Sequence, residues 1–400
     1  MLLAGFARSM KLRALTAILA LSGAVAGAAT LIPQKPADKP AAKASEKSGE
    51  KPGDKANAKP KKAKTVSPQE RIDALSRASV WQAPPPIAKA NFATDPKQPR
   101  EISCTFEIEQ MNGTAPKFDC KTQDGEKLRV KYGRTPEIPG ELASTRLLHA
   151  LGFGSDNMQL YEKVICYGCP KDPFLTMKTL GFVGAEKFYG KVMDPKDHQD
   201  FEWAAVERKH YGRPIETQEV EGWAFFELDL IDAKKGGAPR AHVDALRLLA
   251  VFLAHWDNKS ENQRLVCVSD KDWPAGGKCG RPFAMLQDVG STWGPRKVDH
   301  PEWVKAPIWS DRATCTTSMD ALPYHGATFQ PVKISEAGRQ HLAGLLSQLT
   351  DAQLDALFRS ARFDQSTGMF GGVKATPIEE WVKSFKSRVK QITDGPSCPQ

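Results

Sequence analysis

The sequence predicts an α+β fold in which a sheet-rich first half precedes a helix-rich second half. Residues 102–132 hold short segments of alternating apolar and polar side chains, separated by tight-turn sequences, which is typical of antiparallel strands. After Pro239, apolar side chains instead recur three and four positions apart, as they do on helices that bury one face. Because the strands and the helices occupy separate stretches of the chain, the pattern favours an α+β arrangement in two lobes.

The first 28 residues have the layout of a secretory signal peptide. A short basic stretch precedes an apolar run from Ala14 to about Ala26, and Ala26-Gly27-Ala28 forms a small-x-small cleavage site. The run is shorter than the roughly 20 residues that span a bilayer comfortably, and no later apolar stretch approaches that length. We therefore expect an exported protein, periplasmic or extracellular, with no transmembrane segment once residues 1–28 are removed.

The positive charge lies ahead of the predicted folded domain. The net charge is +9, of which residues 1–32 contribute +3 and residues 33–66 contribute +6, with lysine at every fourth position from Lys35 to Lys59. A Lys/Ala/Pro-rich segment buries no apolar surface, so residues 29–67 are expected to be a disordered linker and residues 68–400 the folded domain. Since that domain is close to neutral, we expect no specific nucleic-acid partner, and only weak contact between the tail and an anionic envelope surface.

The eight cysteines are an even number, as expected for disulfides in an oxidising compartment. The C-x-x-C spacing of Cys166 and Cys169 also occurs in redox and zinc sites, but no second C-x-x-C pair is present to complete a zinc site, so a structural disulfide is preferred. Pairing neighbours along the chain, one of about 105 possible connectivities, gives Cys104–Cys120, Cys166–Cys169, Cys267–Cys279 and Cys315–Cys398.

The elements of the first half follow from alternation and from turn residues. A short helix around 72–81 is expected to end before Pro84-Pro85-Pro86. Asn112-Gly113 and Asp124-Gly125 are turn sequences that separate three antiparallel strands. Apolar residues at helical spacing then predict a helix that opens at Glu141 and is capped by Gly152. The expected strands of this half are 102–110, 118–121, 128–132, 158–167, 174–179, 201–208 and 223–230.

The second half is expected to be mainly helical. An apolar face from Val243 to Leu253 predicts a helix that ends at His255, and a strand pair at 264–268 and 283–286 brackets the loop beyond it. The last ninety residues contain three further amphipathic stretches. They predict helices at 338–349, 351–361 and 377–392.

Polar residues that could take part in catalysis or bind a metal follow the helix that ends at His255. Asp257 and Asn262 lie five residues apart on a loop, so both side chains can face one pocket. The Asp carboxylate can orient a hydroxyl and take its proton, and the Asn oxygen can hold a magnesium ion. After the strand pair, Asp288 opens a D-x-G turn with Gly290, where a carboxylate can ligate the metal that bridges ATP phosphates.

The order H-x-D-x-x-x-x-N, strand pair, D-x-G resembles the catalytic and metal-binding loops of the protein-kinase-like superfamily. The residues of these motifs are most similar to those of its atypical branches, the HipA-like bacterial kinases, the spore-coat CotH kinases and the secretory-pathway family-20 kinases. The resemblance covers roughly residues 100–395. It implies a bilobal kinase-like fold, with an N-terminal lobe at about 100–230 and a C-terminal lobe at about 231–395. It also implies that Asp257 is catalytic and that Asn262 and Asp288 bind magnesium or manganese.

The same resemblance suggests residues for ATP. The turn from Asn112 to Phe118 is similar to the G-x-x-x-K-[FV] turn that replaces the glycine-rich loop in HipA-like kinases, which assigns Gly113 and Lys117 to the phosphates. Lys131 matches the ATP-binding lysine on the third strand. Glu141 matches the acid that pairs with this lysine, and Glu137 is the alternative because the spacing from Lys131 to Glu141 is short.

These features together imply an exported, ATP-dependent, kinase-like phosphotransferase. It would move a phosphoryl group to a hydroxyl of a protein, glycan or small molecule with Mg²⁺ or Mn²⁺. Two alternatives stay open. One is a catalytically inactive kinase-fold binding module of the cell envelope, which the missing glycine-rich loop and the scarcity of ATP outside the cytoplasm favour. The other is an enzyme that transfers AMP from ATP with the same residues.

Overall fold

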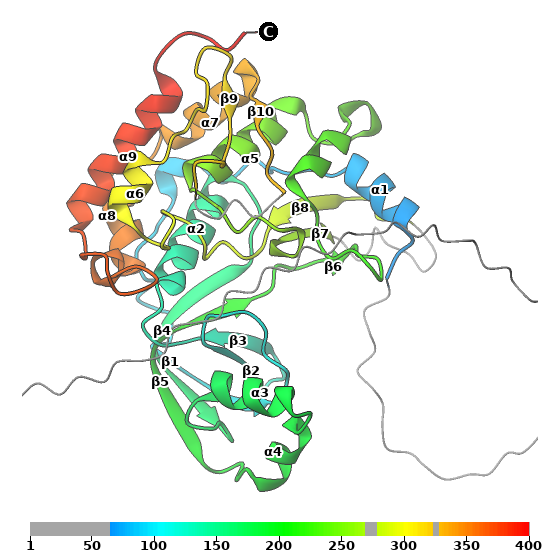
Figure 1. Cartoon of the computed structure of the whole chain (residues 1–400), viewed down its shortest axis with the longest axis vertical. Helices are drawn as coiled ribbons and strands as arrows, with labels where there is room; N and C mark the ends of the chain where they lie inside the picture. Colours follow the sequence, from blue (N-terminus) through cyan, green and yellow to red (C-terminus); the bar gives the residue numbers. More distant parts are fainter. Residues whose placement is uncertain (1–64, 269–277, 323–327, 400) are drawn as a thin grey trace, which may run out of the picture. The chain divides into compact units, whose positions relative to one another are not determined.

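The computed structural model describes residues 65–268, 278–322 and 328–399 (Figure 1). The predicted signal peptide and nearly all of the predicted linker lie outside these ranges. The described residues form both helices and sheets, which confirms a mixed α/β fold. Within the described ranges no helix combines the length and apolar character needed to cross a membrane.

Five strands close into a barrel in the order β1-β2-β3-β5-β4 (Figure 1). The predicted antiparallel run of the first three strands is confirmed, with Cys120 opposite Phe106 and Lys117 opposite Lys131. Closure comes from a parallel pairing of β1 with β4, which places Cys104 opposite Cys166. The strands are β1 Glu101–Glu107, β2 Lys117–Lys121, β3 Lys127–Lys131, β4 Asn157–Tyr167 and β5 His198–Arg208.

The barrel encloses a small hydrophobic cluster, which we call the barrel core. Two disulfides adjoin it: Cys104–Cys120 joins β1 to β2, and Cys166–Cys169 closes the end of β4. Both were predicted from the sequence. The barrel core consists of Cys104, Phe106, Met111, Phe118, Cys120, Leu128, Val130, Tyr161, Val164, Cys166, Cys169, Met177, Phe201, Ala204 and Val206.

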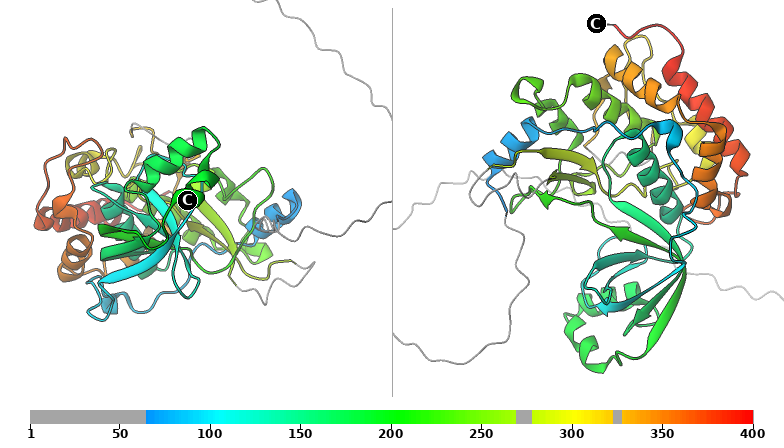
Figure 2. Two further views of the ribbon diagram at one scale, coloured as in Figure 1. Left: turned by 90° about the horizontal axis from the view of Figure 1, so that it is seen from below. Right: turned by 180° about the vertical axis from the view of Figure 1, so that it is seen from behind.

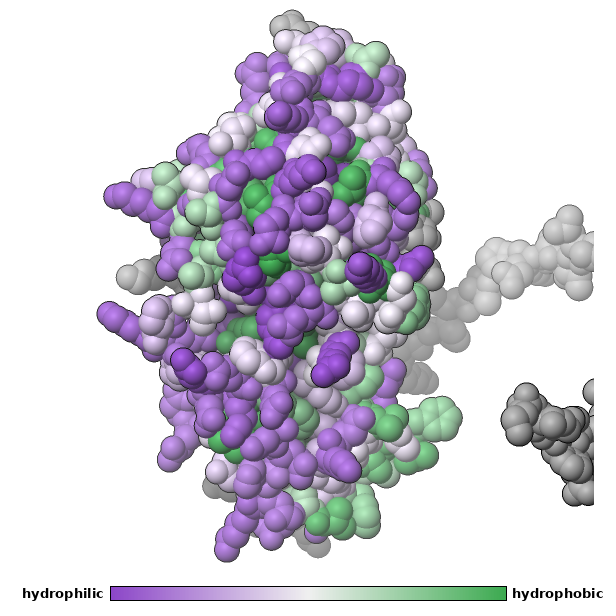
Figure 3. Space-filling view, turned by 90° about the vertical axis from the view of Figure 1, so that its left-hand side faces the viewer, coloured by the Kyte–Doolittle hydropathy of each residue, from purple (hydrophilic) through white to green (hydrophobic). Residues whose placement is uncertain are grey.

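Two short helices, α3 (Pro173–Phe182) and α4 (Glu186–Val192), connect β4 to β5. They leave several large apolar side chains in solvent, among them Phe182, which is 92% exposed, and Phe188. Apolar surface gathers at the lower right of the molecule in Figure 3. Four of the exposed large apolar side chains, at positions 175, 182, 188 and 192, lie in these two helices.

The remaining described helices pack around a second and much larger hydrophobic cluster, the main core, which contains four fully buried tryptophans at positions 223, 293, 303 and 381. Helices α7, α8 and α9 lie side by side, in orange and red in Figure 2. A sheet of three short strands and a two-stranded sheet complete the fold. The helices are α1 Pro68–Ser76, α2 Glu137–Leu151, α5 Arg240–Phe252, α6 His300–Lys305, α7 Glu336–Leu346, α8 Asp351–Ser360 and α9 Ile378–Thr393; the strands are β6 Arg213–Pro214, β7 Gln263–Cys267, β8 Pro282–Leu286, β9 Thr316–Thr317 and β10 Val332–Lys333.

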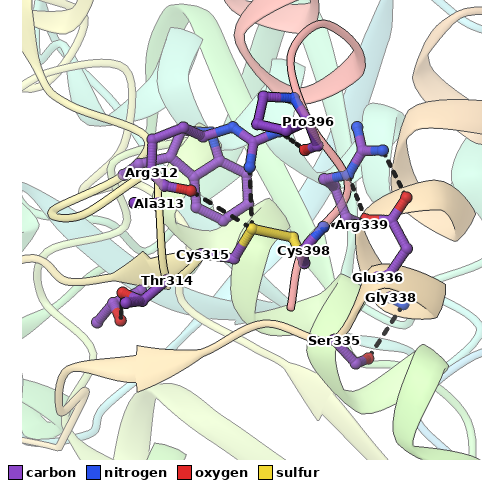
Figure 4. Close-up of a disulfide and its surroundings, with 12 residues drawn as sticks. Arg312, Ala313, Thr314, Cys315, Ser335, Glu336, Gly338, Arg339, Pro396 and Cys398 are labelled. Carbon is purple, nitrogen blue, oxygen red and sulfur yellow. Dashed lines mark hydrogen bonds and ion pairs between the residues drawn. A yellow bond between two sulfur atoms is a disulfide. The ribbon is translucent and has the colours of Figure 1, made fainter. Parts of the chain in front are cut away.

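The last residues of the chain are fastened to the main body by the predicted Cys315–Cys398 disulfide (Figure 4). The Arg312 guanidinium donates to the Pro396 carbonyl at 2.6 Å, and the Glu336 carboxylate accepts from the Cys398 amide at 2.8 Å. The fourth predicted pair, Cys267–Cys279, is also formed. All four pairings expected from the order of the cysteines are therefore confirmed.

Three expected elements differ from the structure, two of them because a side-chain cap fixes the start of a helix. Residues 174–179 lie in helix α3, since Asp172 caps the Leu175 amide and Pro173 occupies the first helical position. Residues 223–230 contain a short 3₁₀ helix, Phe225–Leu230, in place of the expected strand. Helix α1 begins at Pro68 and ends at Ser76, earlier than expected, because Ser67 and Glu70 form a capping box at its start.

Candidate active site

Lys131, at the end of β3, is buried among carboxylates. Its Nζ lies 2.7 Å from Glu141 Oε2, 3.4 Å from Glu137 Oε1 and 3.9 Å from Glu207 Oε2. Lys131 is 2% exposed and Glu141 1% exposed. Of the two acids that the sequence offered as the partner of this lysine, Glu141 is the closer, and Glu137 is shared with Lys297, whose Nζ lies 2.5 Å from Glu137 Oε2.

Helix α2 brings Glu137 and Glu141 to this lysine from the main core. The expectation that Glu141 opens the helix was wrong: α2 begins at Glu137, so Glu141 lies one turn further along on the same side. The helix approaches the D-x-G turn closely. A Cβ on Gly290 would lie 2.2 Å from Glu137 Cγ, and a Cβ on Gly140 would lie 3.1 Å from the Gly290 carbonyl oxygen. Glycine at both positions therefore permits the contact between α2 and the D-x-G turn.

The proton affinity of Glu141 reflects the excess of acid around Lys131. Burial raises the pKa of Glu141 to about 8; the charge of Lys131 opposes this shift, and the charges of Asp288 and Glu207 add to it. Burial lowers the pKa of Lys131, but the charges of Asp288 and Glu141 outweigh burial and hold it well above its usual value. Lys131 is therefore a permanent cation at physiological pH.

The predicted metal-binding residues Asn262 and Asp288 are held next to each other by their backbones. The Asn262 carbonyl accepts from the Gln287 amide at 2.9 Å and from the Asp288 amide at 3.1 Å. The Asn262 side-chain amide donates to the Asp257 carbonyl at 2.6 Å, which leaves its oxygen available as a ligand. The structure thus joins the two predicted ligands and the backbone of the predicted catalytic residue in one hydrogen-bonded unit.

The Asp288 carboxylate is ionised in a cationic environment. Burial raises the pKa of Asp288, but the charges of Lys131 and Lys117 outweigh burial and lower it well below its usual value, with the Gly290 amide and the charge of Lys297 adding to the effect. The Gly290 amide donates to Asp288 Oδ1 at 3.3 Å. An ionised carboxylate oxygen is the kind of ligand that a hard divalent cation prefers.

Lys117 and Lys131 lie directly opposite each other on β2 and β3. Like charges in that position destabilise a sheet, and burial together with the charge of Lys131 lowers the pKa of Lys117. Gly113 adopts a positive φ of 82°, and a Cβ there would lie 3.1 Å from Lys117 Nζ. Two cations in register, with a glycine turn against one of them, would be stabilised by an anion placed between them.

Asp257 stands apart from these contacts. Its side chain is 32% exposed, and its carboxylate lies 3.8 Å from Lys259 Nζ. It is joined to Asn262 through its backbone carbonyl only. His255, two residues earlier, is fully buried, and its Nε2 lies 3.4 Å from Gln263 Oε1, so it supports this loop from within the core.

The donor set fits a divalent cation in part. The side chains of Asn262 and Asp288 supply hard oxygen ligands, and phosphate oxygens and water commonly complete the shell of magnesium. Within the described ranges, no group of three or more His, Cys, Asp or Glu side chains is arranged to hold a metal by itself. The residues therefore suit a metal that arrives with a phosphate-bearing ligand. Of two large surface cavities, about 710 Å³ along α8 and α9 and about 520 Å³ beside α2, neither is lined by these residues.

Sequence reasoning missed two members of the cluster. Lys297 lies nine residues after Asp288 and reaches Glu137 from a stretch with no recognisable motif. Glu207, near the end of β5, is 6% exposed and contacts both Lys131 and Lys209. The one available signal for Glu207 was its position directly after the apolar run Ala204-Ala205-Val206, where a buried carboxylate requires a cationic partner.

Comparisons with known proteins find a low similarity, to solved structures alone. No family model and no curated protein matches the sequence. Among solved structures, the Helicobacter pylori proinflammatory kinase CtkA is similar over 73% of this chain and 94% of its own, at 9% identity and a TM-score of 0.37. The Golgi casein kinase with Mn/ADP bound is similar over 75% of this chain and 72% of its own, at 12% identity and a TM-score of 0.31. Both TM-scores are too low for the likeness to assign this chain to a fold family.

Proposed function

We propose that this protein is an exported, ATP-dependent phosphotransferase with a bilobal kinase-like fold. The observation that carries the proposal is the buried contact of 2.7 Å between Lys131 Nζ and Glu141 Oε2, beside an ionised Asp288 that is tied to Asn262. Phosphoryl transfer depends mainly on positioning and on charge stabilisation, for which a lysine on the α/β-phosphates and two oxygen ligands on the metal are the recurring parts.

Each residue has a role in this proposal. Lys131, held by Glu141, binds the α- and β-phosphates, and Lys117 beside Gly113 binds a phosphate oxygen. Asn262 and Asp288 hold Mg²⁺ or Mn²⁺, which neutralises charge on the phosphates. Asp257, which is accessible to solvent, orients the acceptor hydroxyl and accepts its proton. The acceptor is a hydroxyl of a protein, glycan or small molecule.

The position of a radiolabel in ATP separates this function from its alternatives. The protein is incubated with Mg²⁺ or Mn²⁺ and either γ-labelled or α-labelled ATP, in the presence of several hydroxyl-bearing acceptors. Transfer of the γ label supports phosphoryl transfer, whereas transfer of the α label indicates an AMP-transferring enzyme. Transfer of neither label, with ATP and metal still raising the melting temperature, indicates an inactive binding module.

Asp288→Asn tests the site itself. It keeps the size of the side chain and removes its charge, so we expect a loss of about 100-fold or more in rate, the scale on which removing one charge-stabilising group slows a reaction. Asp320→Asn, at an exposed carboxylate remote in sequence from the motifs, is the matched control and should retain full activity. Equal label transfer by the wild type and Asp288→Asn would refute the proposal.

A further inference from the structure

A cavity of about 520 Å³ lies beside the first turns of α2, on a side of the helix adjacent to the one that carries Glu137 and Glu141. Its walls come from the loop before α2, from β4 and β5, and from the turn after α8. This volume is within the range of small-molecule binding sites. None of the residues assigned to nucleotide or metal lines it.

Two arginines line the cavity without a carboxylate partner. Among the described residues, Arg134 makes no hydrogen bond or ion pair, and the Arg362 guanidinium donates a hydrogen bond only to the side-chain oxygen of Gln365. Burial lowers the pKa of Arg362, and the charge of Arg134 lowers it further against the opposing charge of Asp364. The one acidic side chain in the lining is Glu202, so the wall has a net charge of +1.

Part of the lining is apolar, and two of its side chains are already stacked on each other. Pro139, Leu142 and Leu160 supply an apolar wall, and the Arg362 guanidinium stacks on the Trp203 ring at 4.0 Å from its centroid. Ser366, which is 8% exposed, has a buried hydroxyl with no hydrogen-bond partner among the described residues. An apolar pocket with a few converging polar groups is the usual composition of a small-molecule site.

The backbone at the two stacked residues is unusual. Trp203 and Arg362 both have positive φ, 51° and 63°, although neither is glycine. The antiparallel register of β4 and β5 pairs the residues on either side of Trp203 but not Trp203 itself. Such conformations persist where the surroundings impose them, and they are concentrated at ligand-binding positions.

We propose that this cavity binds a small organic anion, in which a carboxylate, sulfonate or phosphate group is attached to an apolar body. Arg134 and Arg362 contact the anionic group, a planar guanidinium being well suited to planar or tetrahedral oxyanions. Pro139, Leu142 and Leu160 contact the apolar body. The cavity shares no residue with the proposed ATP site, so the proposal of an anion site does not depend on the proposed phosphotransferase function.

The test uses three probes against the full chain in calorimetric titrations. Naphthalene-2-sulfonate carries both parts of the ligand, naphthalene-2-sulfonamide has the same shape without the charge, and inorganic sulfate has the charge without the body. We expect binding of the sulfonate at least tenfold tighter than binding of either of the other two. Equal affinity for sulfonate and sulfonamide would overturn the proposal, as would no detectable binding of the sulfonate.

Two variants that change the charge of the cavity wall in opposite directions test whether the ligand binds in this cavity. Arg134 is exposed, and its replacement removes no hydrogen bond or ion pair with another described residue, so Arg134→Gln should fold and weaken sulfonate binding about tenfold. Glu202→Gln should strengthen sulfonate binding severalfold. Arg100→Gln, at an arginine whose side chain is 79% exposed outside the cavity, is the matched control and should leave the affinity unchanged. An equal effect of Arg134→Gln and Arg100→Gln, or weaker binding in Glu202→Gln, would overturn the assignment to this cavity.

Discussion

The barrel core and the main core are stabilised in different ways. The barrel core contains few residues, four of which are disulfide-bonded cysteines. The main core is much larger and buries five tryptophans; it contains the cysteines of one disulfide, Cys267–Cys279, and the Cys315–Cys398 disulfide fastens the end of the chain to it. Small cores bury too little apolar surface to be stable alone, and covalent cross-links commonly compensate for this.

The candidate site takes residues from both regions. Lys117 and Lys131 belong to strands of the barrel, whereas Glu141 and Asp288 belong to the main body of the fold. Any loosening of the barrel relative to α2 would separate Lys131 from Glu141. The disulfides of the barrel are therefore expected to matter for the geometry of the site as well as for stability.

The largest expected effect is in the main core. Phe385, fully buried in α9, packs against Phe252, whose ring centroid lies 4.9 Å away, and against Trp293. Phe385→Ala should lower the free energy of unfolding by about 3–5 kcal/mol, because it leaves a cavity among close-packed rings. Urea unfolding measures the loss. Phe182→Ala, at a phenylalanine that is 92% exposed, is the control and should change stability by less than about 0.5 kcal/mol.

Hydrogen exchange shows whether the two cores are separate in this variant. We expect Phe385→Ala to accelerate exchange of amides in α5, α7 and α9 more than in β1 and β2. Equal acceleration in all five elements would show that the two cores unfold as one unit, and it would contradict separate stabilisation of the barrel core and the main core.

A smaller effect is expected from opening the barrel disulfide. Replacing Cys104 and Cys120 by serine should destabilise the barrel by about 2–4 kcal/mol, because a loop with a sequence separation of 16 regains its freedom in the unfolded chain. Exchange of the β1 and β2 amides should accelerate while that of α9 stays unchanged. Replacing Cys166 and Cys169, whose separation is 3, should have the smaller effect. The reverse order would show that loop length does not govern these cross-links.

The smallest expected effect depends on pH and comes from a histidine of helix α2. Burial lowers the pKa of His149, in α2, below its usual value. A depressed histidine pKa adds stability above the unfolded pKa of about 6.5, and this stability is lost as the pH falls through the folded pKa. Between pH 7.5 and 5.0 the wild type should therefore lose up to about 1 kcal/mol more stability than His149→Gln. Identical losses in the two proteins, measured by urea unfolding, would contradict this assignment.

Turn residues and apolar periodicity predicted the elements that are determined by residues close together in the sequence. The Asp124-Gly125 turn identified the hairpin of β2 and β3, and the apolar periodicity before His255 identified α5. The order of the cysteines gave all four disulfides, since each bonds a neighbour in that order. The parallel pairing of β1 with β4 was not predictable, because nothing in either segment encodes a partner so distant in sequence.

Part of the candidate site was also predictable from the sequence. Asn262 and Asp288 were identified by spacing, and the structure places them in backbone contact. Glu207 and Lys297 were missed, because each joins the cluster through neighbours in space and not through a motif. The start of α2 was misplaced because Pro139 lies in its first turn, where a proline is tolerated, and was not recognised as helical.

The parallel pairing that closes the barrel also constrains the order in which the chain can fold. Cys104 and its strand partner Cys166 are 62 positions apart, so β1 can pair with β2 early but must wait for β4 to acquire its second neighbour. Contacts between distant segments form slowly, because a long loop has to close before they stabilise the chain. A chain that emerges N-terminus first would therefore present an open, three-stranded sheet with β1 unpaired along one edge. In that interval the Cys104–Cys120 disulfide can already form, and it would hold β1 in register until β4 arrives.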